Sequence, residues 1–292
     1  MTTPSAKPAL QPLVISAPFG NYIQPAGCTP TLGTFTAARR PGRLWRILRT
    51  VRYYPRLGAW VNKIGLRNPG IDWLVRRAAQ APETVRDKLV SIHGFCDDDW
   101  WTLLDKAAAL KPLGIELNMS CPNVGHVNWP DSLFDRAVAT GVPIVVKLPP
   151  VNYREMFQSA LQAGVRAFHC CNTIPVPAGG VSGKPLKPVA IQCILDVRTI
   201  AARHADAPAR TQPHTADPSS PIPAPAPAPG VLIIGGGGIT TPQDVDDYAS
   251  AGADVFAVGT KVFNPAYLLS HSGLNDVLAR ARHHAGAAST PR

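Results

Sequence analysis

The residue types best suited to chemistry lie in residues 114–123, where a strand-like pattern runs into a polar loop. Apolar and polar side chains alternate in the first half of this stretch, which is the period of a half-buried β-strand. Pro122 ends the pattern, because a proline cannot donate to a sheet ladder. The strand end therefore carries the amides of Asn118 and Asn123 and the thiol of Cys121. Amides supply donors and acceptors together, and a thiol whose pKa is tuned can act as an acid or a base.

The rest of the chain alternates between strand-like and helix-like segments, which predicts a parallel sheet with helical crossovers. The expected strands are residues 12–17, 30–36, 87–94, the stretch 114–123 up to its stop at Pro122, and residues 142–147, 167–172, 230–234 and 253–258. The expected helices are residues 71–81, 97–110, 131–140, 153–163, 188–203, 242–251 and 266–285. Eight strands, each but the first with room for a helix after it, predict a (β/α)₈ TIM barrel of the α/β class. The first βα unit is abbreviated.

A single domain is expected over residues 12–285, with a disordered N-terminal tail at residues 1–11 and a C-terminal tail at residues 286–292. Residues 208–229, just before the seventh strand, are rich in proline and alanine and cannot bury a core. We expect them to form a disordered, extended insertion.

Composition narrows the class of protein. The chain has 292 residues, 45% of them hydrophobic, which is enough for one barrel. It contains no apolar run of 18 residues and no signal-like N-terminus, so we expect no membrane span and a cytoplasmic protein. None of the six cysteines forms a C-x-x-C pair, so no metal site is expected. The net charge of +10 fits nucleic acid or anionic small molecules equally.

Residues 39–56 are the most basic part of the chain. Arg43, Arg46 and Arg49 recur at every third position with apolar residues between them. One interpretation is a basic amphipathic helix that lies on an acidic surface or a membrane. The commoner alternative is a surface helix or loop with solvated arginines.

Glycines follow the seventh and eighth expected strands, at residues 235–238 and at Gly259-Thr260. Phosphate sites in TIM barrels frequently form from these two loops, because a backbone without Cβ atoms can approach a dianion closely. The alternative is a plain turn at a barrel corner. Lys147 ends the fifth strand, where a fixed cation would stabilise an anion, although a surface lysine is the commoner reading of such a residue alone.

These motifs resemble those of the dihydroorotate dehydrogenase family. Residues 116–123, Glu-Leu-Asn-Met-Ser-Cys-Pro-Asn, are similar to the family's E-L-N-x-S-C-P-N signature. Further matches are Asn62 with Gly65-Leu66 and Asn68-Pro69-Gly70, Asn172-Thr173, residues 179–183, Leu186-Lys187-Pro188, Gly237-Gly238-Ile239 and Val258-Gly259-Thr260.

The resemblance implies oxidation of dihydroorotate to orotate, a step of UMP biosynthesis, with FMN as cofactor. Cys121 would be the base that takes a proton from C5 while a hydride passes from C6 to flavin N5. A cysteine here resembles the class 1 enzymes, whereas the membrane-associated class carries serine. Because a free thiol has a pKa of about 8.5, activity should rise with pH as the thiolate forms.

The resemblance also assigns binding roles. Lys147 would lie near flavin N1 and O2. The implied substrate-binding residues are Asn62, Asn118, Asn123, Asn172 and Thr173. The implied cofactor-binding residues are Ala17, Gly20, Asn118, Lys147, Gly180, Ser182, Gly183, Gly237, Gly238, Gly259 and Thr260.

One departure concerns the second strand. The family usually carries a lysine in a T-K-T-like motif there, and this chain has Thr34-Phe35-Thr36. Either Arg39 or Arg40 reaches into the site instead, or the site has lost a cation, which would weaken carboxylate binding.

The implied electron acceptor is fumarate or a partner electron-transfer subunit, and a homodimer is considered.

Three other interpretations stay open. Dihydropyrimidine dehydrogenases share a similar Asn-x-x-Cys-Pro segment, and dihydrouridine synthases place Cys-Pro after a related strand. The third is a barrel that binds FMN or nucleic acid without catalysis, although the retained Cys121 and Lys147 argue against it.

Overall fold

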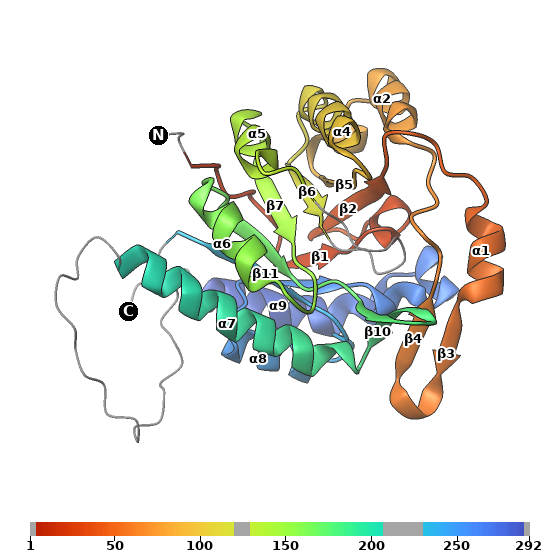
Figure 1. Ribbon diagram of the computed structural model, residues 1–292. Helices are drawn as coiled ribbons and strands as arrows, with labels where there is room; N and C mark the ends of the chain where they lie inside the picture. The colour runs from red at the N-terminus through yellow and green to blue at the C-terminus, as the bar shows by residue number, and fades with distance from the viewer. Residues whose placement is uncertain (1–3, 120–128, 207–229, 289–292) are drawn as a thin grey trace.

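The computed structural model describes residues 4–119, 129–206 and 230–288. Eight parallel strands close into a barrel in the order β1-β12-β11-β8-β7-β6-β5-β2, with the helices outside (Figure 1). The strands are β1 (Leu13–Ile15), β2 (Cys28–Phe35), β5 (Leu89–Ile92), β6 (Gly114–Asn118), β7 (Ile144–Lys147), β8 (Ala167–Cys170), β11 (Leu232–Gly236) and β12 (Val255–Val258). The predicted TIM barrel is confirmed.

Helices cover the outside of the barrel and follow the strands as expected. They are α2 (Ile71–Gln80), α3 (Glu83–Arg86), α4 (Asp97–Ala109), α5 (Leu133–Ala139), α6 (Arg154–Gln162), α7 (Leu186–Asp206), α8 (Pro242–Ser250) and α9 (Asn275–Ala288). Only the 3-10 turn η1 (Phe19–Asn21) separates β1 from β2, so the abbreviated first unit is also confirmed. The expected insertion at residues 208–229 lies outside the described residues.

The expected helix over residues 266–285 is wrong in its first half. The chain forms η3 (Thr260–Phe263), η4 (Pro265–Leu268) and η5 (Ser272–Leu274) before α9 begins. The Asn264 side chain accepts a hydrogen bond from the backbone amide of Ala266. Gly273 packs so closely against Tyr267 that a Cβ on it would lie 2.6 Å from the Tyr267 hydroxyl. These local contacts interrupt the helical period that the sequence suggested.

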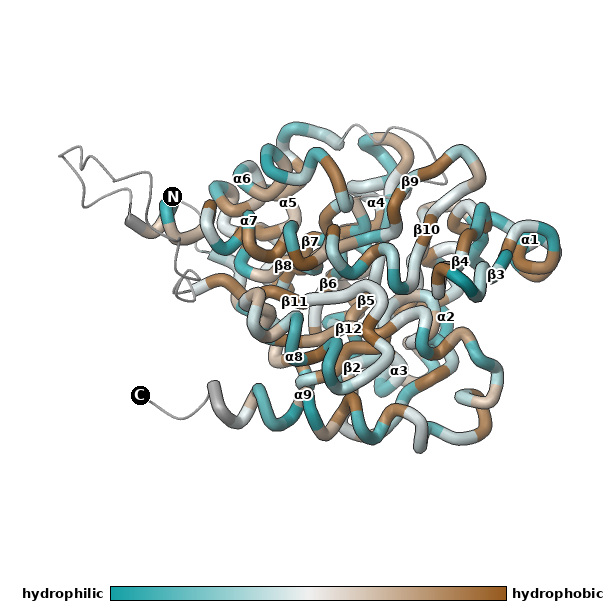
Figure 2. The backbone as a smooth tube through the Cα atoms, turned by 90° about the horizontal axis from the view of Figure 1, so that it is seen from below, coloured by the Kyte–Doolittle hydropathy of each residue, from teal (hydrophilic) through white to brown (hydrophobic). Residues whose placement is uncertain are grey.

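Alternation along the strands divides the core in two. One set of side chains points outward and packs under the helices, as Ile115 and Leu117 do. The other set fills the barrel interior, where Val14, Leu89 and Val145 form a small apolar cluster. Figure 2 shows apolar residues concentrated along the strands at the centre of the molecule. Polar inward residues lie above that cluster, which is the end where a barrel keeps its chemistry.

A second, antiparallel sheet was not predicted. It joins β3 (Arg52–Tyr54), β4 (Ala59–Asn62), β10 (Gly179–Gly183) and β9 (Ile174–Val176) in the order β3-β4-β10-β9. The helix α1 (Arg43–Thr50) and the turn η2 (Pro55–Leu57) belong to the same excursion of the chain, which projects from one side of the barrel (Figure 1). Trp60 of β4 stacks on Phe263 with ring centroids 4.5 Å apart, which ties the sheet to the end of β12.

The N-terminal residues 4–11 were expected to form a disordered tail, and the structure corrects this. The Ser5 amide donates to the carbonyl of Gly164, and the Ser5 hydroxyl accepts from the amide of Ile144. Leu10 packs against the inner apolar cluster. The segment is thereby fastened to the barrel.

Candidate active site

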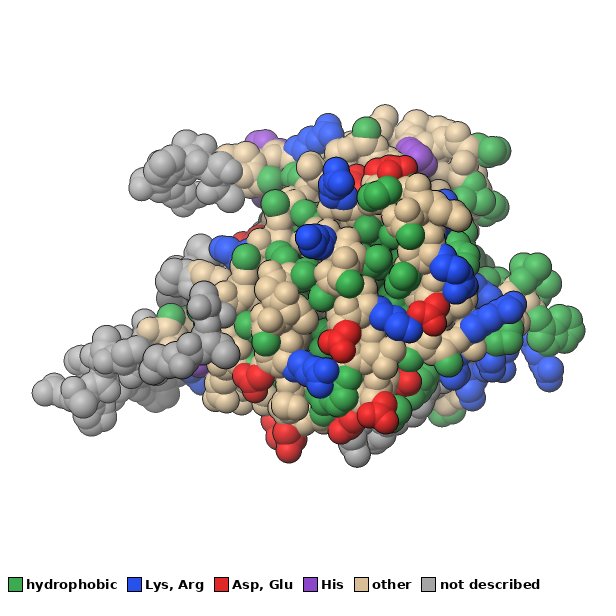
Figure 3. Space-filling model, turned by 90° about the horizontal axis from the view of Figure 1, so that it is seen from above, with side chains coloured by type: hydrophobic (Ala, Val, Ile, Leu, Met, Phe, Trp, Pro, Cys, Tyr) green, Lys and Arg blue, Asp and Glu red, His purple; other side chains and the backbone are tan. Residues whose placement is uncertain are grey.

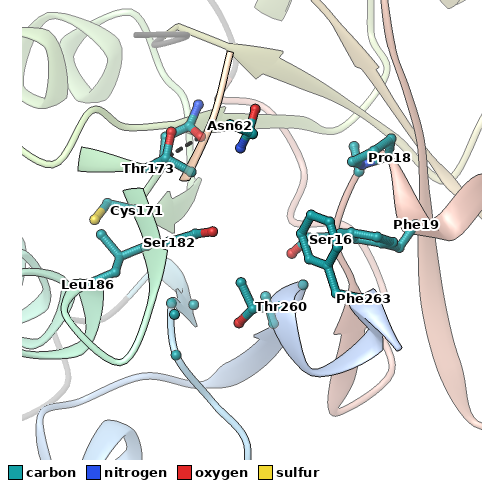
Figure 4. Close-up of a pocket in the computed structure, with 18 of the residues that line it drawn as sticks. Ser16, Pro18, Phe19, Asn62, Cys171, Thr173, Ser182, Leu186, Thr260 and Phe263 are labelled. Atoms are coloured by element: carbon teal, nitrogen blue, oxygen red, sulfur yellow. Dashed lines mark hydrogen bonds between the residues drawn. The ribbon is translucent and has the colours of Figure 1, made fainter. Parts of the chain in front are cut away.

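A pocket opens at the carboxyl ends of the barrel strands and encloses about 890 Å³ of space, part of it open to solvent. In Figure 4, Asn62 and Thr173 lie at one edge of the open centre, Thr260 lies at another, and the Ser182 hydroxyl points into it. A second lobe continues from the same residues toward the ends of β2 and β6.

The structure brings most of the predicted site residues to these two lobes. They are Ala17, Asn62, Asn118, Lys147, Asn172, Thr173, Ser182, Gly183, Gly237, Gly238, Gly259 and Thr260. Two others do not reach the lining. Gly20 packs against β2, where a Cβ would lie 2.4 Å from the Thr31 carbonyl, and Gly180 pairs with Asn62 in the second sheet. Cys121 and Asn123 lie outside the described residues.

Polar side chains form one side of the pocket, called here the amide side after its three asparagines. Its members are Asn62, Asn118, Asn172, Lys147 and Thr34. The Asn172 Nδ2 donates to Asn118 Oδ1 at 2.8 Å, and Asn118 Nδ2 donates to the Thr34 hydroxyl at 2.9 Å. Thr34 in turn shares a hydrogen bond of 2.9 Å with the Ser91 hydroxyl. The chain of bonds fixes the orientation of the Asn118 and Asn172 amides before any ligand arrives, which is the preorganisation that a binding site needs.

A buried charge cluster supports the amide side from below. The fully buried Glu116 accepts from His169 Nδ1 at 2.9 Å, and Lys147 is also buried. Burial alone would raise the pKa of Glu116, but the Lys147 charge, the His169 hydrogen bond and the Ser91 hydroxyl outweigh it and bring the pKa to about 2. Burial and the Lys147 charge lower the pKa of His169, so its ring is neutral and donates from Nδ1. Lys147 thus stays beside an anion at the floor of the pocket.

The opposite side is backbone and is called here the glycine side: Gly183, Gly237, Gly238 and Gly259. Gly238 has a φ of +74°, and a Cβ on it would lie 2.7 Å from the Gly183 carbonyl. Gly259 differs, because a Cβ there would meet nothing closer than the Ser16 Cβ at 3.8 Å and would project into the pocket. The first glycine allows close packing of two loops, and the second leaves room for a ligand against the main chain.

Phe35 does not face the pocket. Its ring is buried under α2, where it stacks on Trp73 with centroids 6.3 Å apart. Successive side chains of a strand point to opposite faces, so Thr34 is the neighbour that faces inward. Phe35 therefore adds no side chain to either lobe of the pocket.

The arginines that line the second lobe come from α1 and from the loop before α2, not from β2. Arg43, at the start of α1, lines both lobes, and Arg67 lines the second one. Arg39 and Arg40, expected as replacements, are not among the lining residues. The Arg40 guanidinium lies over the Phe95 ring, 4.5 Å from its centroid. Sequence reasoning missed Arg43 because the path of α1 across the pocket depends on the second sheet.

In the part of the chain that the structure describes, no helix combines the length and apolar character needed to cross a bilayer. Among the same residues, no group of three or more His, Cys, Asp or Glu side chains could hold a metal ion.

Comparison with known proteins gives consistent results. The family model of dihydroorotate dehydrogenase matches residues 25–204. The catalytic subunit of dihydroorotate dehydrogenase B (NAD(+)) from Latilactobacillus sakei is 28% identical, over 87% of this chain and 90% of the relative. Dihydroorotate dehydrogenase A (fumarate) from Limosilactobacillus reuteri is 28% identical, over 75% of each chain.

A solved structure supports the fold. The crystal structure of a ligand-free dihydroorotate dehydrogenase from Eimeria tenella has a TM-score of 0.68 at 17% identity and covers 96% of this chain and 89% of its own. At that identity the likeness establishes the barrel. The family model, which spans more than half of the chain, establishes the relationship: the chain belongs to the dihydroorotate dehydrogenase family of oxidoreductases.

Proposed function

We propose that the protein oxidises dihydroorotate to orotate with FMN as cofactor and with Cys121 as the base. The observation that supports this most strongly is the pairing of two unlike sides in one pocket. Fixed amides and a buried lysine face a backbone surface that a phosphate-bearing, planar cofactor can approach.

The residues present fit FMN. The Gly259 backbone borders open pocket, and Gly237, Gly238 and Gly183 place further main chain around the same space. Backbone amides of this kind bind phosphate oxygens. Lys147 lies on the pocket floor, where a cation would favour a cofactor that gains negative charge on reduction. When bound, FMN supplies the acceptor for the hydride that leaves substrate carbon C6.

The substrate would bind on the amide side. Dihydroorotate has a ring with carbonyl acceptors and N–H donors, and an asparagine can satisfy both. Asn62, Asn118 and Asn172 line the lobe that Arg43 and Arg67 border. We assign the substrate carboxylate to Arg43, because this guanidinium lines both lobes and so lies where cofactor and substrate meet.

Cys121 follows the last residue of β6 by three positions in the sequence. As the thiolate it would remove the C5 proton, and the C5–C6 double bond forms as the hydride leaves C6. The thiolate is a small fraction at neutral pH, because a free thiol has a pKa of about 8.5. The rate of substrate oxidation should therefore rise with pH toward that value.

The acceptor is proposed more broadly, as fumarate or a partner electron-transfer subunit. The two named relatives, one a B (NAD(+)) and one an A (fumarate) enzyme, are equally similar to this chain at 28% identity. We also propose that the protein is a homodimer and that it is cytoplasmic. None of the described contacts favours dihydrouracil, tRNA or a non-catalytic role over dihydroorotate.

The test is anaerobic mixing of the FMN-loaded protein with dihydroorotate while flavin absorbance is followed. We expect bleaching in the wild type, bleaching slowed by about 10² or more in Cys121→Ala, and a smaller loss in Cys121→Ser. Cys96→Ser is the matched control, because Cys96 is exposed at the start of α4 and outside the pocket.

Absence of bleaching by dihydroorotate in a flavin-containing wild type would refute the substrate. Bleaching by dihydrouracil instead would favour the dihydropyrimidine alternative. A Cys121→Ala variant that bleaches at the wild-type rate would remove the cysteine base while leaving the substrate intact.

A further inference from the structure

The helix α1 turns its apolar side outward. Leu44, Trp45 and Leu48 are 71%, 65% and 67% exposed, whereas Leu103 and Leu104 of α4 are fully buried. The opposite side of α1 faces the molecule, where Arg43 and Ile47 line the pocket. A surface helix of a globular protein normally does the reverse.

The neighbouring hairpin extends this surface. Leu57, at the turn between β3 and β4, is 63% exposed, and Tyr53 and Tyr54 of β3 are about half exposed. In Figure 3 hydrophobic side chains gather at the edge of the molecule formed by this excursion, with Lys and Arg side chains beside them. We call the set Leu44, Trp45, Leu48, Tyr53, Tyr54 and Leu57 the apolar edge. An exposed apolar patch rimmed by polar residues marks an interaction site.

The charge around the apolar edge has one sign. Arg46, Arg49, Arg52 and Arg56 alternate with its members in the sequence, and no Asp or Glu occurs in the first 71 residues. Among the described residues, none of these four arginines forms a salt bridge with a carboxylate. The occupant must therefore combine an apolar layer with negative charge.

We propose that the apolar edge docks on the surface of a bilayer that contains anionic phospholipid. Leucine and tryptophan side chains insert at the boundary between headgroups and acyl chains, tyrosines lie at the headgroup level, and the arginines contact phosphates. A second copy of the chain fits less well, because the same patch from both copies would bring only cations to the interface and no carboxylate to pair with them. This proposal is independent of the reaction proposed above.

The experiment is co-sedimentation of the full-length, FMN-loaded protein with vesicles. We expect binding to phosphatidylglycerol/phosphatidylcholine vesicles to exceed binding to pure phosphatidylcholine by about tenfold or more, and to fall as salt is raised. The triple variant Leu44→Ser/Trp45→Ser/Leu48→Ser should lose the binding. The charge variant Arg49→Gln/Arg56→Gln should lose the preference for anionic lipid.

Leu268→Ser/Leu269→Ser is the matched control, because both leucines are exposed but lie outside the apolar edge, and it should bind as the wild type does. Flavin content and thermal unfolding verify that each variant is folded. If the triple variant does not fold, the single variant Trp45→Ser replaces it in the experiment. A wild type that does not bind anionic vesicles at low salt overturns the proposal. A folded triple variant that binds anionic vesicles as well as the wild type also overturns it. So does a wild type that self-associates instead of binding lipid, if the triple variant abolishes the self-association.

Discussion

The two sides of the pocket are built in different ways. The amide side consists of side chains joined by hydrogen bonds, from Asn172 through Asn118 and Thr34 to Ser91. The glycine side consists of backbone, with Gly238 and Gly183 packed too closely for a Cβ. Side chains can be matched to the donors and acceptors of one ligand, whereas bare backbone suits a phosphate or a flat ring. The difference indicates that substrate choice and cofactor binding are separable by mutation.

Lys147→Met should have the largest effect, because this cation serves both sides. Loss of a fixed charge at a developing anion costs about 10² to 10³ in rate. The variant also removes the Lys147 charge that lowers the pKa of Glu116, so we expect this pKa to rise and the protein to lose a few kcal/mol of stability. Single-turnover flavin reduction and denaturant unfolding measure the two losses.

Lys106→Met is the control for that variant. Lys106 pairs with Asp72 on the surface, where both side chains are well exposed. We expect its removal to change stability by less than about 1 kcal/mol and the rate not at all. Equal losses in the two variants would show that Lys147 is only a structural ion pair.

The buried charge cluster predicts an acid-sensitive fold. The pKa of Glu116 is about 2 in the folded protein against an ordinary value of 4.5. A lowered pKa means that the stabilisation is present above 4.5 and is lost as pH falls toward 2, and it amounts to about 3 kcal/mol. The free energy of unfolding of Glu116→Gln should depend less on pH in this window. An unchanged pH dependence would contradict a lowered pKa of Glu116 in the folded protein.

Asn118→Ala should weaken substrate binding, because Asn118 holds Asn172 and Thr34 in place. We expect a loss of about tenfold to 10² in kcat/KM for dihydroorotate, and a destabilisation of about 1–3 kcal/mol from the partners left unpaired. Steady-state kinetics and thermal unfolding test this. A variant with normal kinetics would show that the hydrogen-bonded chain does not orient the substrate.

Arg43→Gln should have the smallest effect. Arg43 is partly exposed and also donates to the Tyr22 hydroxyl at 3.0 Å, so solvent weakens its hold on a carboxylate. We expect KM for dihydroorotate to rise about threefold to tenfold with kcat little changed, because only ground-state binding is lost. Arg77→Gln, on α2 and outside both lobes of the pocket, should leave KM unchanged.

Much of the barrel was predictable because its strands are short, apolar and separated by helical segments. The period in β6 also places Glu116 and Asn118 on the inner face, although the role of Glu116 as partner of His169 was not expected. The second sheet was not predictable in the same way. It pairs Asn62 with Gly180 across a long stretch of chain, and β10 contains three glycines, which have little strand propensity.

The outward direction of the Phe35 side chain could not be predicted from its motif. Aligning motifs gives the residue but not the face of the strand, and β2 carries a register shift between Leu32 and Phe35. A shift of one residue exchanges the inner and outer faces. The exposure of the apolar side of α1 could not be predicted for a related reason. A helical period shows that a helix has two faces but not which of them packs against the protein.

The most direct test of the two-sided pocket is to measure the dissociation constants of FMN and of orotate for Asn62→Ala and Gly259→Ala. Asn62 lies on the amide side, and a Cβ at Gly259 would project into the cofactor space without a clash in the fold. We predict that Asn62→Ala weakens orotate by about tenfold and leaves FMN unchanged. Gly259→Ala should weaken FMN by about tenfold with unfolding unchanged, and FMN-saturated Gly259→Ala should bind orotate as the wild type does. If each variant weakens both ligands equally, the division of the pocket into a substrate side and a cofactor side is wrong.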